Sequence, residues 1–78
     1  MEMRKQTIEY SSPLDAVIAL AKRLQVYESN QGMASETFYD QYSKGLLADN
    51  LVYIEWSNDY RNYLALRREL EERLRHAA

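Results

Sequence analysis

The sequence predicts a mainly α-helical protein, with an N-terminal β-strand arm followed by a small three-helix domain. Three observations lead to this fold class. Residues 50–76 contain no Gly or Pro and repeat apolar or aromatic side chains every three or four positions, which is typical of a helix. Ser12 and Pro13 are typical of a helix start. Gly32 and Gly45 are typical of helix ends, so they separate the chain into three predicted helices. We therefore expect one domain over 1–78, in which a short helix braces two long helices.

The long helix predicted at 50–76 is the main reason to expect self-association. At about 1.5 Å per residue it is roughly 40 Å long, whereas a compact chain of this size is about 30 Å across. Its C-terminal end should therefore need cover from another chain, as in an intertwined homodimer. The residues expected at this partner or dimer interface lie along one side of the helix: Tyr60, Tyr63, Leu66, Leu70 and Leu74.

The other long helix is predicted at 13–31, and the short helix at 35–44. In the first, Ser12 is the expected cap, Pro13 occupies the first helical position, and Gly32 suits a left-handed C-terminal cap. Its expected apolar face comprises Leu14, Val17, Ile18, Ala21, Leu24 and Tyr27, and Leu20 and Val26 widen this face beyond one stripe. Trp56 is expected to be buried against some of four residues on the helices at 13–31 and 35–44: Leu14, Ile18, Phe38 and Tyr42.

Residues 3–10 alternate partly between polar and apolar side chains, which predicts a strand. Because no second strand candidate follows, this arm should pair with a partner or a second copy. Ile8 and Tyr10 would face protein. Arg4, Lys5 and Thr7 are the candidate DNA contacts if the arm binds nucleic acid.

The composition argues against an enzyme and against a cofactor. The 78 residues include no Cys, and the one His, at position 76, lies near the C-terminus. Zinc ligand sets and a nucleophile–base pair are therefore hard to build. Carboxylate pairs one helical turn apart occur at Glu36/Asp40 and Glu55/Asp59, but the Glu-x-x-His ligands of dimetal bundles are missing. We expect no catalytic, cofactor or metal site.

The expected location is the cytoplasm, with no membrane association. The start of the chain is polar and is not followed by a signal-type apolar stretch, and no apolar run approaches the length of a membrane span. The formal net charge of −2 argues against nucleic-acid binding over the whole surface, although it leaves a local basic strip open.

The order of elements resembles a family of small bacterial and archaeal proteins, frequent in cyanobacteria. They are typically described as antitoxin components of type II toxin–antitoxin modules. The similarity is carried by Met-x-Ser-x-x-Phe at 33–38, Gly45, the acidic cap at Asp49, and Ile-Glu-Trp at 54–56. It implies a cytosolic protein that neutralises a co-encoded toxin by binding it, and it assigns no ligand to any residue.

Two other function classes fit the same order of elements. Strand–helix–helix is the order of ribbon-helix-helix DNA-binding repressors, in which two chains pair their strands and insert them into the major groove. Against this stand Glu9 on the same face as Lys5 and Thr7, the long first helix, and the acidic net charge. A structural dimerisation module is the remaining alternative.

Overall fold

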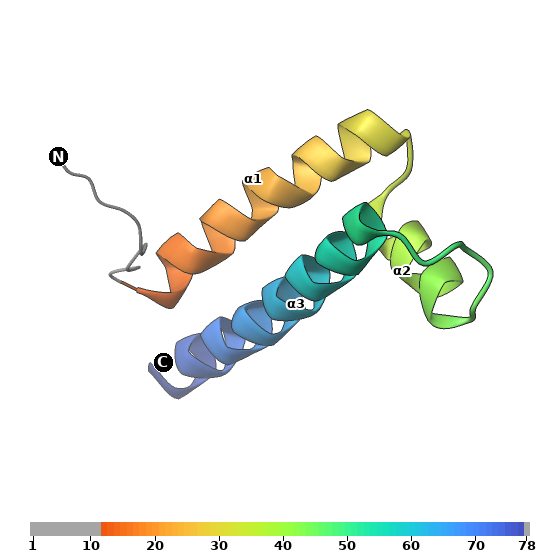
Figure 1. Ribbon diagram of the computed structural model, residues 1–78. Coiled ribbons are helices and arrows are strands. Elements are labelled where there is room, and N and C mark those ends of the chain that lie inside the picture. The colour runs from red at the N-terminus through yellow and green to blue at the C-terminus, as the bar shows by residue number, and fades with distance from the viewer. Residues whose placement is uncertain (1–11, 78) are drawn as a thin grey trace, which may run out of the picture.

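Three helices make up the computed structural model, which describes residues 12–77 (Figure 1). They are α1 (Pro13–Gln31), α2 (Ser35–Ser43) and α3 (Leu51–Ala77), and no strand occurs within this described range. The prediction of a mainly helical chain is confirmed. The predicted arm at 3–10, with Ile8, Tyr10 and the candidate DNA contacts, lies outside the described residues.

The ends of α1 are set by side chains and glycine geometry that the sequence predicted. Ser12 Oγ accepts a hydrogen bond from the backbone N–H of Asp15 at 3.2 Å, and Pro13 occupies the first helical turn. Gly32 has a φ of 67°, in the left-handed region that favours glycine. The N–H groups of Gly32 and Met33 both donate to the carbonyl of Glu28, which closes the C-terminal turn of the helix.

The connection from α2 to α3 is held by similar local bonds. Gly45, with a φ of 77°, lets the chain reverse, and the N–H of Leu46 donates to the carbonyl of Gln41 at 3.0 Å. Asn50 Oδ1 then accepts from the N–H of Tyr53 at 2.9 Å and caps α3. The predicted intervals of 35–44 and 50–76 thus differ by one residue from the observed ends of α2 and α3.

α1 and α3 lie side by side and run in opposite directions, so the start of α1 is near the end of α3 (Figure 1). The short helix α2 packs beside the first half of α3. The core forms where all three meet, around Leu24, Phe38, Trp56 and Tyr60. Phe38 and Trp56 are both 0% exposed, and their rings stack in parallel with centroids 3.8 Å apart. The predicted burial of Trp56 against Phe38 is confirmed.

The predicted buried face of α1 was wrong in part. Leu14 and Ile18 are 50% and 45% exposed, whereas Leu20 and Leu24 are buried together with Ala16, which was not on the predicted face. Positions 16, 20 and 24 are separated by one helical turn each and so form a single stripe. α1 carries apolar residues around most of its circumference, so periodicity alone could not select the stripe that faces α3.

Candidate functional site

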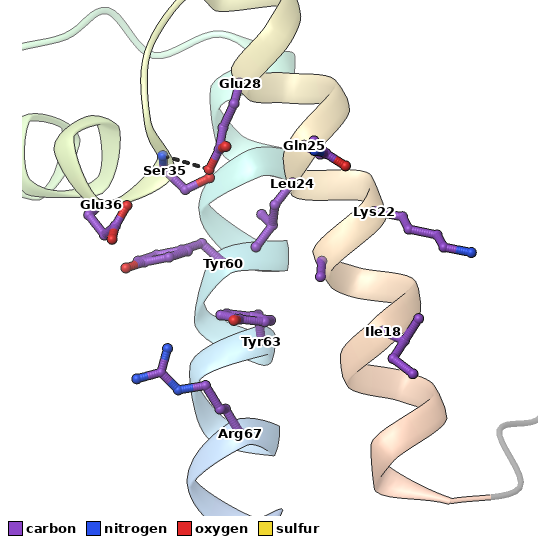
Figure 2. A pocket seen from close by; sticks show the side chains of 11 residues that line it. Ile18, Lys22, Leu24, Gln25, Glu28, Ser35, Glu36, Tyr60, Tyr63 and Arg67 are labelled. Atoms are coloured by element: carbon purple, nitrogen blue, oxygen red, sulfur yellow. Dashed lines mark hydrogen bonds between the residues drawn. The ribbon is translucent and has the colours of Figure 1, made fainter.

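A groove of about 440 Å³ lies along the surface between α1 and α3, just beyond the first turn of α2. Its apolar part is formed by Ile18 and Leu24 from α1 together with the rings of Tyr60 and Tyr63 from α3. Figure 2 shows Leu24 extending from α1 towards α3, Tyr63 in front of the α3 ribbon, and Tyr60 extending towards the first turn of α2. The first turn of α2 closes one end of the groove with Ser35 and Glu36.

Charged side chains border the groove, with opposite signs towards its two ends. Glu28 and Glu36 lie at the end next to α2, whereas Lys22 and Arg67 lie further along the helices (Figure 2). Such a groove has an apolar floor and a charged rim, which is the usual anatomy of a surface that binds another protein.

The aromatic floor of the groove is tied to its basic border. The guanidinium carbon of Arg67 lies 5.8 Å from the centroid of the Tyr63 ring, within the range of a cation–π contact. A side-chain hydrogen bond with Tyr63 raises the pKa of Arg67, so the guanidinium stays charged. Burial raises the pKa of Tyr60, and its hydroxyl therefore remains a neutral donor at neutral pH.

Ser35 joins the three helices at the end of the groove next to α2. Its Oγ accepts a hydrogen bond of 2.9 Å from the indole Nε1 of Trp56, and its backbone N–H donates to Glu28 Oε2 at 2.9 Å. Glu28 thereby supplies α2 with a carboxylate at its N-terminus, where the helix dipole favours negative charge. The sequence marked Ser35 only as a helix start, because neither partner is close to it along the chain.

A second polar cluster fastens α1 to α3 outside the groove. Asp59 is 8% exposed, and its Oδ2 accepts hydrogen bonds from Arg23 Nη2 at 2.8 Å, Arg23 Nε at 3.1 Å and the Tyr27 hydroxyl at 2.9 Å. The carboxylate that the sequence paired with Glu55 as a candidate metal ligand is thus engaged by α1, while Glu55 is exposed.

Tyr27→Phe should destabilise the fold by about 1–2 kcal/mol at neutral pH, because it removes a partly buried hydrogen bond to a charged acceptor. Burial, and then the bond to Asp59, raise the pKa of Tyr27 above its ordinary value of 10.0. The stabilisation it provides is therefore complete below pH 10.0 and is lost as the pH rises through the folded pKa.

Chemical denaturation at several pH values checks this expectation. The stability difference between the parent and Tyr27→Phe should shrink above pH 10.0. Tyr39→Phe is the matched control, since Tyr39 contributes a ring contact to Tyr60, with centroids 5.3 Å apart, and should change stability by less than about 0.5 kcal/mol. A constant difference across the whole pH range would contradict the assignment.

The structure separates the interface residues predicted on α3 into two groups. Tyr60 is buried in the core, and Tyr63, Leu66 and Leu70 are half-buried within a single chain. Only Leu74, which is 65% exposed, is left open to solvent. Because α1 runs alongside α3, the part of α3 that its own chain leaves uncovered is shorter than the prediction from helix length.

Other large apolar side chains are exposed at the opposite end of α3. They belong to the α2–α3 connection and the first turns of the helix: Leu46, Leu51, Val52 and Ile54. None of these four positions was predicted as an interface. The sequence does show that Leu46, Leu51, Val52 and Ile54 fall within nine positions, and this density of aliphatic residues was the available signal.

Comparison of the chain with protein-family models, with curated proteins and with solved structures finds no match. No helix in the described part of the chain is long and apolar enough to cross a membrane. Within the same residues, no group of three or more His, Asp and Glu side chains could hold a metal ion. The groove and the exposed apolar end of α3 are therefore the features on which a function can be argued.

Proposed function

We propose that this protein is an antitoxin-like protein of the cytoplasm that binds and neutralises a co-encoded toxin through protein–protein contacts. The observation that supports this proposal is the exposure of aliphatic side chains around the start of α3. Leu46 and Leu51 are 68% and 69% exposed, and Val52 and Ile54 add to the same stretch of chain. Groups of exposed apolar side chains on small proteins commonly mark binding surfaces.

This surface is held in shape before any partner arrives. The N–H of Leu46 donates to Gln41, the N–H of Ile54 donates to the carbonyl of Asn50 at 2.9 Å, and Tyr42 donates to Asp49. Leu47 and Tyr53, interspersed with the exposed residues, pack against the core. A preorganised surface loses little conformational entropy on binding, so more of the contact energy appears as affinity.

Acidic side chains near these leucines favour a basic partner. Asp49 and Glu55 are both exposed and lie immediately before and after the residues 50–54. A rim of one sign attracts a partner of the opposite sign and raises the rate of encounter. The chain as a whole carries a formal net charge of −2, so a small basic toxin suits it in the same way.

The two other function classes remain alternatives without an observation of their own. A ribbon-helix-helix repressor depends on Arg4, Lys5 and Thr7, which lie outside the described residues. A pure dimerisation module would need no exposed surface at the start of α3. The same experiment separates all three classes, because each predicts a different binding partner.

Leu51→Asp should weaken neutralisation while sparing the fold. Leu51 is the first residue of α3, a position at which the helix dipole tolerates an acidic residue well. A carboxylate there would be desolvated without a partner in the complex, so affinity should fall at least about 10-fold. The measurements are growth rescue on co-expression with the product of the neighbouring reading frame, and titration calorimetry with that product.

Thr37→Asp is the matched control, since it introduces the same charge at an exposed position in the first turn of α2. It should neutralise the toxin as well as the parent does. Equal neutralisation by Leu51→Asp would contradict the placement of the surface. Binding of promoter DNA by the parent, without binding of the neighbouring product, would favour the repressor instead.

A further inference from the structure

One exposed face of α3 reads as complementary to itself. Leu64, Arg67, Glu71 and Leu74 follow one another at intervals of three, four and three residues, so they share one side of the helix. All four are exposed, and Leu74 is 65% exposed. In order along the helix the face is apolar, basic, acidic and apolar. An antiparallel second helix therefore presents its acidic residue opposite the basic one, and its basic residue opposite the acidic one.

We propose that this face binds the same face of a second copy, with the two α3 helices antiparallel. If Arg67 of one protomer is set opposite Glu71 of the other, Leu64 falls opposite Leu74 in the same register, since each pair of numbers has the same sum. A two-fold axis between the helices then generates both kinds of contact twice. The register therefore satisfies charge and apolar burial together.

The groove between α1 and α3 supplies the rest of the proposed binding surface. Arg67 borders it, and Ile18 lies across it on α1, so the second copy's α3 is in reach of both helices. The incoming helix would point its C-terminal end towards α2. That end carries Arg73, Arg75 and His76, and it would approach the part of the groove bordered by Glu28 and Glu36.

The two charged residues of the proposed contact already form an ion pair within α3. Arg67 Nε lies 3.6 Å from Glu71 Oε2 in the same helix, and both side chains are more than half exposed. In the antiparallel pair these two residues and their two symmetry mates form one four-charge network. Networks that exclude water are stronger than isolated surface pairs, which contribute little on their own.

The proposal goes beyond toxin binding and is independent of it, because the surface at the start of α3 is not used. It also identifies Leu64 and Glu71 as interface residues, in addition to the series from Tyr60 to Leu74 that the helix periodicity indicated. The occupant is a second copy, because its α3 provides charges in the order that the groove requires.

Charge reversal tests the register directly. Arg67→Glu and Glu71→Arg should each weaken the homodimer of the full chain at least about 10-fold in Kd, because each sets like charges opposite each other. A mixture of the two variants should form a heterodimer with an affinity close to that of the parent. Loss of the ion pair within α3 cannot be repaired by mixing, so recovery in the mixture is specific to the contact between chains.

Sedimentation equilibrium over a concentration series measures all four samples, with circular dichroism as the check on folding. A parent that stays monomeric to about 100 μM, far above a micromolar Kd, would overturn the proposal. So would single variants that dimerise as tightly as the parent, or a mixture that fails to recover. A foreign helix as the true occupant would appear as a monomeric parent and is therefore covered by the first outcome.

Cross-linking supplies a second, independent readout, since the chain contains no Cys. Under a mild oxidant, Leu64→Cys mixed with Leu74→Cys should give a disulfide-linked dimer, because antiparallel register brings these positions together. Neither variant alone should cross-link efficiently. Efficient cross-linking of Leu64→Cys with itself would indicate parallel helices and would overturn the proposal.

Discussion

Trp56→Ala should cost about 3–5 kcal/mol of folding free energy, the range for removing a buried Trp or Phe side chain. Trp56 is 0% exposed, stacks on Phe38 on one side, and lies 5.6 Å from the Tyr27 ring on the other. A domain of this size is stable by only about 4–12 kcal/mol in total. The variant should therefore be largely or wholly unfolded at 37 °C, as measured by urea denaturation followed by circular dichroism.

Trp56→Phe separates the ring stacking from the indole hydrogen bond. This variant keeps an aromatic ring against Phe38 but removes the donor to Ser35 Oγ. The lost bond and the smaller ring should together cost about 1–3 kcal/mol, clearly less than the alanine variant. A Trp56→Ala protein that melts at the temperature of the parent would show that Trp56 does not hold the three helices together.

The helix ends could be predicted because they depend on neighbours in the sequence. Ser12 caps a group three residues ahead, Gly32 adopts a left-handed conformation, and Asn50 caps a group three residues ahead. Each arrangement is decided by residue types within one helical turn, which a sequence displays directly. The same holds for the aromatic residues of α3, because their spacing alone indicates one side of a helix.

Contacts between distant residues could not be predicted in the same way. Arg23 and Asp59 are 36 positions apart, and Trp56 and Ser35 are 21 apart. The Arg23–Asp59 pair depends on which side of α1 faces α3, and α1 is apolar on most sides, whereas the Trp56–Ser35 pair depends on how α2 packs against α3. A rotation of α1 that buried Leu14 and Ile18 would have satisfied the sequence pattern equally well.

The candidate site follows from that same rotation. Because Ala16 and Leu20 face α3, Ile18 is left beside the groove, and Leu14 remains half-exposed on the same helix. The interface predicted on α3 from periodicity contained Leu66 and Leu70, which are half-buried within the chain. The residues of the proposed dimer contact, Leu64 and Glu71, lie outside the predicted set because the prediction selected the most apolar stripe of the helix.

Arg23→Ala should destabilise the fold by about 2–3 kcal/mol, although the Arg23 side chain is 59% exposed. The reason lies with its partner: the Asp59 side chain is 12% exposed, and removing Arg23 leaves a nearly buried carboxylate with only the Tyr27 hydroxyl. Fully buried pairs cost more when broken, and the partial exposure of this pair places its cost at the lower end of that range.

Adding Asp59→Leu to Arg23→Ala should recover most of the lost stability, since no charge is then left buried. Thermal and urea denaturation of both single variants and the double variant measure the coupling between the two positions. A loss below about 0.5 kcal/mol for Arg23→Ala, or no recovery in the double variant, would show that the pair is an ordinary surface ion pair.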